Sequence, residues 1–177
     1  MLTYVQILDQ ATGSSAQLHS VIAHCAEWLT DENYGGFSRE HCQALSNCSQ
    51  PGELGKVLAE AAEQATDVLL VYYSGHGFAD QSDDGIELLL PLPGTDYDEM
   101  SLTALHYLEI RRKFRRSRAK LKILIVDCCF SGLAIGTPLS GVGIPADDVI
   151  EIHGAAILAS SSEMYRSLSP ENAVYTA

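Results

Sequence analysis

The chain has 177 residues, of which 46% are hydrophobic, and its formal net charge is −12. This length and apolar content suffice for one substantial core, so a single domain over residues 1–177 is expected. No apolar run approaches the length of a membrane span and no signal peptide is recognisable, which predicts a soluble, cytoplasmic protein. The acidic excess argues against general nucleic-acid binding and favours cationic substrates.

The first part of the chain alternates predicted strands and helices. Residues 3–8 form an expected strand, and apolar residues at helical spacing predict a helix over residues 16–29. A glycine-rich turn at residues 34–37 precedes a second expected strand at residues 42–45. The helical pattern returns over residues 52–65.

The second part contains the most apolar strands. Residues 68–73 are apolar without alternation, as in a parallel strand covered on both faces, and residues 121–126 are similar. A short strand at residues 88–90 and a helix at residues 102–118 are expected between them, and a buried strand follows at residues 154–160. This alternation predicts an α/β fold with a mostly parallel sheet and helices on both faces.

Two glycine-flanked turns follow the most apolar strands. Ser-Gly-His-Gly occupies residues 74–77, and Asp-Cys-Cys-Phe-Ser-Gly occupies residues 127–132. Because reactive residues in such sheets lie at the carboxyl ends of strands, His76 and Cys129 are expected within reach of each other. A thiol attacks as thiolate, and a nearby histidine accepts its proton and later protonates a leaving amine. The pattern therefore predicts a cysteine hydrolase.

These two motifs resemble those of the caspase and metacaspase superfamily of cysteine peptidases. In the caspase signature the histidine precedes the cysteine motif by about 50 residues, and the interval from His76 to Cys129 fits. The Gln-Ala-Cys-x-Gly pentapeptide of animal caspases is absent, whereas the Asp-x-Cys-x-Ser-Gly pattern is of the metacaspase type. The resemblance covers residues 3–162 approximately, points to the bacterial caspase-like branch, and implies a three-layer sandwich with cysteine endopeptidase activity.

The resemblance also implies individual roles. In the metacaspase pattern the reactive cysteine lies two positions after the aspartate, so Cys129 rather than Cys128 is the expected nucleophile, with His76 as the acid–base group. A short helix near Ser131 would favour the thiolate. The backbone N–H groups of Gly77 and Cys129 are the natural donors to a developing oxyanion, and no third catalytic side chain is assigned.

The expected specificity is for basic residues. Asp127 and Ser74 occupy the positions that in metacaspases line the pocket for the residue before the cut, and Asp9 is a further acidic candidate. A buried carboxylate favours arginine first and lysine second, so cleavage after aspartate is not expected. The structural alternatives are a helix cap for Asp127 and a steric choice for Ser74.

No cofactor or metal is expected, although calcium remains an alternative because some metacaspases bind it. The acidic residues between positions 80 and 99 lack the ligand spacing of an EF-hand and are interpreted as solvated loops. The five cysteines lack disulfide or zinc spacing and are expected to be free thiols. The basic segment at residues 111–122 is interpreted as a solvated helix face, so contact with nucleic acid is not expected.

Regulation and completeness are further expectations. Residues 136–148 are rich in glycine and proline and sit where caspase-like enzymes carry a flexible linker. Arg166 is positioned for self-cleavage, and residues 173–177 resemble the start of the helix after the fifth strand, so the final strand and helix of the fold are expected to be missing. The resemblance further implies a protein or peptide substrate, an activating protein partner, and a bacterial stress or defence pathway.

Two other interpretations stay open. A catalytically silent caspase-like interaction or scaffold domain would use the basic helix to bind a partner, although the pairing of His76 with Cys129 argues against it. A doubly wound ligand-binding domain of flavodoxin type would need a phosphate-cradling glycine loop after the first strand, which this sequence lacks.

Overall fold

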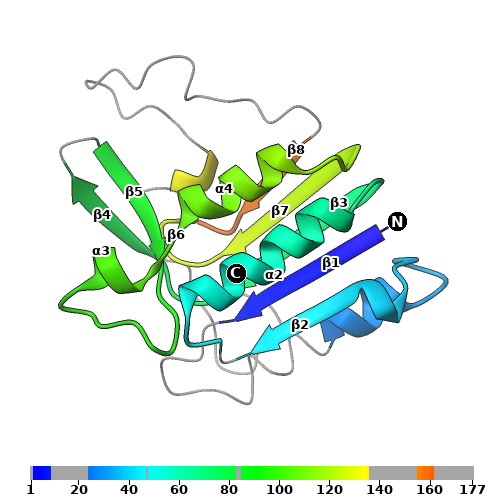
Figure 1. The fold of residues 1–177 in the computed structure, drawn as a ribbon, viewed down its shortest axis with the longest axis horizontal. Helices are drawn as coiled ribbons and strands as arrows, with labels where there is room; N and C mark the ends of the chain where they lie inside the picture. Colours follow the sequence, from blue (N-terminus) through cyan, green and yellow to red (C-terminus); the bar gives the residue numbers. More distant parts are fainter. Residues whose placement is uncertain (1, 9–23, 47, 83–84, 136–154, 162–177) are drawn as a thin grey trace.

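A five-stranded parallel sheet forms the centre of the computed structural model, which describes residues 2–8, 24–46, 48–82, 85–135 and 155–161 (Figure 1). The strand order is β2-β1-β3-β7-β8. The strands are β1 (Leu2–Leu8), β2 (Cys42–Ser46), β3 (Val68–Ser74), β7 (Leu121–Asp127) and β8 (Ala155–Ala159). All neighbouring pairs are parallel, so their carboxyl ends meet at one edge of the sheet.

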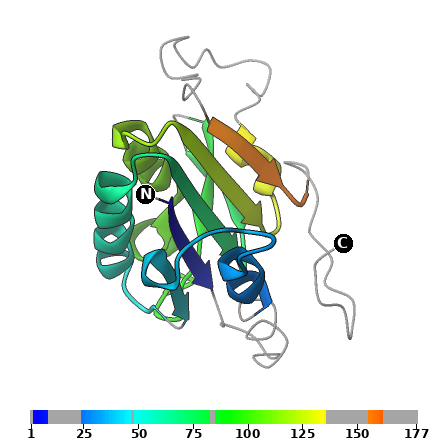
Figure 2. The ribbon, with the colours of Figure 1, turned by 90° about the vertical axis from the view of Figure 1, so that its right-hand side faces the viewer.

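Helices cover both faces of this sheet. Helices α2 (Pro51–Gln64) and α4 (Tyr107–Arg116) lie on one face, and the helical residues 24–30 lie on the other (Figure 2). Successive side chains of a strand point to opposite faces, so Val71 packs with the α2 and α4 side while Leu70 and Tyr72 pack toward residues 24–30. The prediction of a mostly parallel α/β sandwich is therefore confirmed.

A small antiparallel sheet lies beside the carboxyl edge of the large one. It consists of β4 (Phe78–Ser82), β5 (Gly85–Leu90) and β6 (Leu105–His106), in that order. The short helix α3 (Met100–Thr103) precedes β6, and two 3₁₀ turns are η1 (Arg39–His41) and η2 (Ser131–Ile135). The chain thus adds a hairpin directly after the turn that contains His76.

The prediction of one helix over residues 102–118 was wrong. Helix α3 ends at Thr103, and α4 begins only at Tyr107. Between them Leu90 pairs with Leu105 and Leu89 with His106 in the antiparallel sheet. Leu105 is buried by this strand pairing rather than by a helical stripe, which is why its apolar character misled the periodicity argument.

The other predicted elements within the described residues are confirmed in position to within a few residues. The prediction that the last strand is buried was wrong, because β8 has no buried residue and Leu158 is 53% exposed. It has β7 as its sheet neighbour on one side, and the strand order places nothing described on the other. The helix predicted over residues 16–29 is described only for its second half, as residues 24–30. Asp9, Arg166, the expected linker at residues 136–148 and the chain end at residues 173–177 lie outside the described residues. None of the helices in the described ranges has the length and apolar character needed to cross a bilayer.

Candidate active site

The ends of β3 and β7 bring the two predicted motifs together. Ser74, the last residue of β3, is the register partner of Asp127, the last residue of β7. Beyond the strands, the Gly75 N–H donates a hydrogen bond to the Asp127 carbonyl oxygen at 3.1 Å. His76 and Cys129 therefore each lie two residues beyond this pair of register partners, on loops that leave the sheet side by side.

The two loops touch at Gly77, which is buried. A Cβ atom built on this glycine would overlap the carbonyl oxygen of Cys129 and would lie 2.7 Å from Cys128 Sγ. No real Cβ makes such contacts, so only glycine permits this approach of the two backbones. The loop that carries His76 consequently packs directly on the loop that carries Cys129.

The two adjacent cysteines have different surroundings. Cys128 is 2% exposed and belongs to the hydrophobic core, whereas Cys129 is partly exposed. Burial, together with the nearby Cys129 and Asp127, raises the pKa of the Cys128 thiol well above its usual value, so that thiol stays protonated. Of the two, Cys129 is the thiol that a substrate can approach.

The turn at Cys129 is strained. Phe130, the next residue, has a φ of 58°, in the left-handed region that bulky side chains rarely adopt. Such a conformation costs of order 1–3 kcal/mol and persists only where surrounding structure enforces it. Here it turns the chain sharply from β7 into η2, immediately after the thiol.

A hydrogen bond from Tyr73 anchors the loop that contains His76. The Tyr73 hydroxyl donates to the His76 carbonyl oxygen at 2.7 Å, and the Tyr73 side chain is fully buried. The histidine itself is partly exposed. Sequence reasoning missed this anchor, because an aromatic residue in an apolar strand is equally explained by core packing.

Asp127 lines a cavity on the sheet face that residues 24–30 cover. The cavity has a volume of about 430 Å³, and Asp127 is the only charged residue among the described residues that line it. The others are Cys25, Trp28, Leu29, Leu70, Tyr72, Ile125, Leu158, Ala159 and Ser160. The result is a buried carboxylate at the wall of a largely apolar hollow.

Asp127 is 7% exposed, and its Oδ2 accepts a hydrogen bond from the Tyr72 hydroxyl at 3.2 Å. Burial and the negative charge of Asp127 raise the pKa of Tyr72, so its hydroxyl remains a donor. Ser74 is also buried but is not among the described residues lining this cavity. The structure thus places Asp127 at the wall of this cavity and Ser74 outside its described lining.

A comparison with protein-family models matches residues 23–172 to the caspase domain. The chain belongs to the caspase domain family. Caspase domains are cysteine peptidases, so this family supports a hydrolase-type, peptidase-like function with protein substrates. A search of curated proteins found no match.

The caspase domain contains a serine pair that sequence reasoning missed. Ser161 lies just beyond β8, and its N–H donates to Ser131 Oγ at 2.9 Å. In return the Ser131 N–H donates to Ser161 Oγ at 3.2 Å, and Ser161 Oγ donates to the Cys128 carbonyl oxygen at 3.1 Å. Ser161 also lies at the carboxyl end of a parallel strand, where reactive residues of such sheets lie, but a serine there is as common in ordinary turns.

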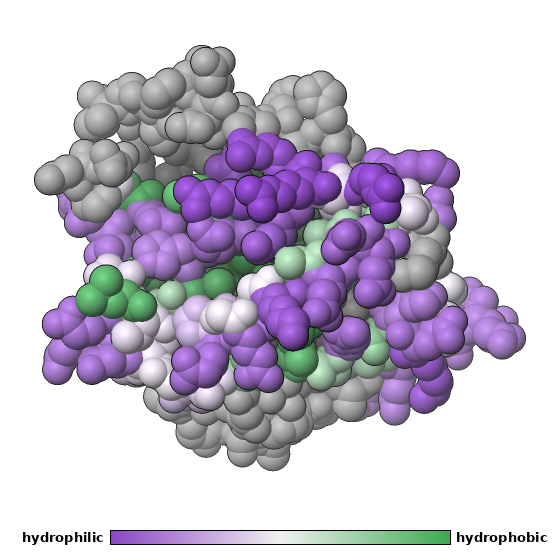
Figure 3. All heavy atoms as spheres, viewed as in Figure 1, coloured by the Kyte–Doolittle hydropathy of each residue, from purple (hydrophilic) through white to green (hydrophobic). Residues whose placement is uncertain are grey.

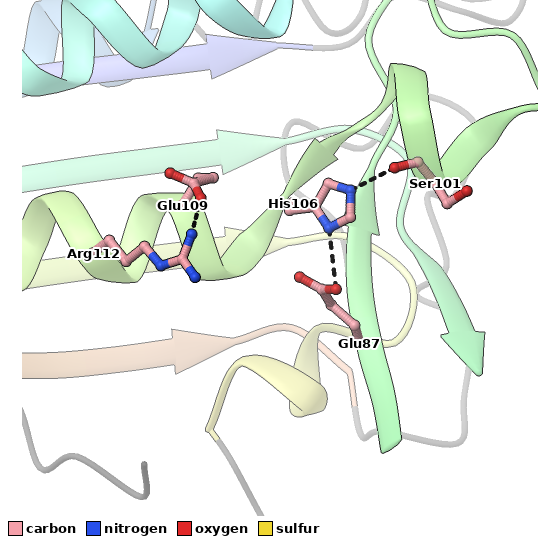
Figure 4. Close-up of polar contacts among 5 residues, drawn as sticks. All are labelled: Glu87, Ser101, His106, Glu109 and Arg112. Carbon is pink, nitrogen blue, oxygen red and sulfur yellow. Dashed lines mark hydrogen bonds and ion pairs between the residues drawn. The ribbon is translucent and has the colours of Figure 1, made fainter. Parts of the chain in front are cut away.

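A second polar cluster involves the small sheet and the helices α3 and α4 (Figure 4). His106 Nδ1 is 3.0 Å from Glu87 Oε2, and His106 Nε2 is 2.7 Å from the Ser101 carbonyl oxygen. Both partners are acceptors, so the arrangement suits an imidazolium that donates from both nitrogens. Nearby, Arg112 pairs with Glu109 on α4.

Within the described residues, no group of three or more His, Cys, Asp or Glu side chains is arranged to hold a metal ion. All five cysteines are free thiols. Hydrophilic side chains dominate the surface over α4 (Figure 3), where Ile110 and Phe114 face the core while Arg112, Arg115 and Arg116 are exposed.

Proposed function

We propose that this caspase domain is a cysteine endopeptidase in which Cys129 is the nucleophile and His76 the acid–base group. The observation that carries the proposal is the meeting of their two loops. Both leave the sheet from the paired ends of β3 and β7, and they pack against each other at Gly77 without an intervening side chain. The burial of Cys128 supports the choice of the exposed neighbour.

In this mechanism His76 accepts the proton of Cys129, and the thiolate attacks the carbonyl carbon of the scissile peptide bond. The C–S bond forms while the carbonyl π electrons move to oxygen, and the N–H groups of Gly77 and Cys129 stabilise that oxyanion. Collapse expels the amine, which takes the proton from the imidazolium. Water, deprotonated by His76, then hydrolyses the thioester and releases the Cys129 thiol.

The proposed substrate has arginine, or secondarily lysine, before the cut, as in metacaspases. Asp127 supports this specificity because it presents a buried carboxylate to a largely apolar cavity. A cation with an aliphatic stem matches such a pocket in both charge and shape, and arginine adds bidentate geometry. Ser74 and Asp9 are further proposed substrate-binding residues of this pocket.

The test is a peptide-library cleavage assay combined with labelling by an arginyl chloromethylketone. We expect cleavage after arginine and lysine, and covalent labelling that is lost in both Cys129→Ala and His76→Ala. Cys128→Ala is the matched control, because it removes the adjacent buried thiol and leaves the labelled one. Efficient cleavage after aspartate alone would contradict the specificity.

Labelling that survives in Cys129→Ala would contradict the assignment of the nucleophile. A folded wild-type protein that cleaves no peptide and is not labelled would instead favour a non-catalytic caspase-like interaction domain. These outcomes separate the two classes of function without knowledge of the natural substrate.

A further inference from the structure

The peptide unit between Cys128 and Cys129 contains two polar groups that point in opposite directions. Its N–H belongs to Cys129 and is a donor in the proposed oxyanion hole. Its carbonyl belongs to Cys128. The described residues contain no cis peptide bond, and in a planar trans unit the N–H and C=O point in opposite directions. Whatever holds the Cys128 carbonyl therefore sets the direction of the Cys129 N–H.

The group that holds this carbonyl is a side chain. Ser161 Oγ donates to the Cys128 carbonyl oxygen at 3.1 Å, and Ser160 Oγ lies at 3.5 Å, at the outer limit for a hydrogen bond. Ser161 is itself fixed by the reciprocal bonds with Ser131, which is fully buried. The reciprocal bonds with Ser131 thus fix the position of the Ser161 hydroxyl that contacts Cys128.

The two preceding carbonyls are held differently. The Val126 oxygen accepts from the Ser160 N–H at 3.2 Å, and the Asp127 oxygen accepts from the Gly75 N–H at 3.1 Å. Backbone donors just beyond β8 and in the loop after β3 therefore fix the chain up to Asp127. The next carbonyl, that of Cys128, is held by side-chain hydroxyls, and Ser161→Ala removes the shorter of its two hydrogen bonds while the backbone bonds to Val126 and Asp127 stay.

We propose that Ser161 is a positioning residue of the oxyanion hole and that Ser131 positions Ser161 in turn. By holding the Cys128 carbonyl, Ser161 directs the Cys129 N–H toward the place where the oxyanion develops. The bond also polarises the peptide unit, which makes that N–H a stronger donor. This inference rests on the proposed function, because it assigns a task within the same site.

The experiment compares three readouts on the full chain with Ser161→Ala. For an arginyl peptide amide we expect kcat to fall about tenfold with KM unchanged, less than the roughly 10²–10³-fold loss when a donor is removed outright. An arginyl aldehyde, whose thiol adduct carries a tetrahedral oxygen in the same place, should bind more weakly by a similar factor. Alkylation of Cys129 by iodoacetamide forms no oxyanion, so its rate should not change.

Two control variants separate positioning from general disruption. Ser161→Thr keeps the hydroxyl and should restore kcat. Ser117→Ala removes another buried serine, whose Oγ accepts the Ala119 N–H at 3.2 Å near the opposite end of β7, and should leave all three readouts unchanged. Because Ser160 stands nearby, the Ser160→Ala/Ser161→Ala double variant should show at least the loss of the single variant.

Equal losses of kcat and of the alkylation rate in Ser161→Ala would overturn the proposal, and so would an unchanged kcat with unchanged aldehyde binding. The carbonyl carbon-13 resonance of labelled Cys128 should shift upfield in Ser161→Ala, since it loses a hydrogen-bond donor. A wild-type protein that cleaves no peptide would contradict the proposed function itself. The carbon-13 shift would still show in that case whether Ser161 holds this carbonyl.

Discussion

The Tyr72 hydroxyl donates a hydrogen bond to Asp127 Oδ2 at 3.2 Å, across two neighbouring strands of the sheet. The two side chains line the same cavity, so the carboxylate is held in place before any substrate enters. A carboxylate that is already oriented loses little freedom when it binds a guanidinium. This pair leads to the first prediction.

Asp127→Asn should lower kcat/KM for an arginyl peptide by roughly 10- to 100-fold, because a hydrogen bond to a charged partner contributes about 1.5–3 kcal/mol. A matched peptide with citrulline in place of arginine should lose much less. Tyr72→Phe, which leaves the charge in place, should show a smaller loss for the arginyl peptide. Equal losses with both peptides would argue that Asp127 does not recognise the cation.

Trp28 should contribute to affinity rather than to turnover. It lines the cavity with Asp127, and an indole face within reach of a bound cation contributes about 0.5–1 kcal/mol at an exposed site. Trp28→Ala should therefore raise KM for arginyl peptides a few-fold, by roughly 2- to 5-fold, with kcat unchanged. Tyr34→Ala is the control, because Tyr34 stacks on Trp28 at 5.5 Å but is not among the described lining residues.

Gly77→Ala should abolish most activity. The added Cβ would overlap the Cys129 carbonyl oxygen, so the two loops must separate. A displacement of reactive groups by about 1 Å can cost on the order of 100-fold in rate, and kcat should fall at least this far. Gly55→Ala, in α2, has nothing within 4 Å of its Cβ and should leave kcat unchanged while stabilising the helix by about 0.5–1 kcal/mol.

Thermal or urea unfolding of both alanine variants measures their stability, so that a loss of kcat can be distinguished from a loss of folded protein. If Gly77→Ala remained as active as Gly55→Ala, the two loops would not require the close approach described here. That outcome would also weaken the proposed pairing of His76 with Cys129.

His106 should make stability depend on pH near neutrality. Burial lowers its pKa, but the hydrogen bonds to the Ser101 carbonyl and to Glu87, with the charges of Glu87 and Glu109, outweigh burial and raise the pKa above its usual value. A raised pKa stabilises the fold fully below about pH 6.5, and this contribution is lost as the pH rises through the folded-state pKa.

The unfolding free energy should therefore fall as the pH increases above about 6.5, by less than about 1 kcal/mol because the ion pair is partly exposed. Urea titrations of His106→Gln and of Glu87→Gln should both show a flatter profile than the wild type over this range. A wild-type profile as flat as that of the variants would exclude the protonated pair.

The sequence was sufficient to predict the large sheet because β3 and β7 are strongly apolar and because predicted strands alternate with helical patterns along the chain. It was insufficient for the small sheet. Phe78–Ser82 contains three polar residues and an alanine, and Leu105–His106 is only two residues long, so neither shows a strand pattern. Their pairing with β5 is a tertiary effect that no local propensity contains.

The candidate site likewise contains residues that the sequence predicts and residues that it does not. His76, Cys129 and Asp127 stand out because reactive residue types follow apolar strands. Ser161 and Tyr73 do not stand out, since a serine after a strand and a tyrosine inside one are ordinary in turns and cores. Their importance comes from which backbone oxygen each hydroxyl reaches, and that depends on the register between strands far apart in the sequence.

The left-handed turn at Phe130 has one more consequence. A glycine would take this angle without steric cost, yet the chain has an aromatic residue whose ring packs against the hydrophobic core. The bend beside the thiol can relax only if that ring leaves its neighbours. The conformation of the reactive loop and the packing of the core therefore depend on each other. A mutation that disturbs one of them will also disturb the other.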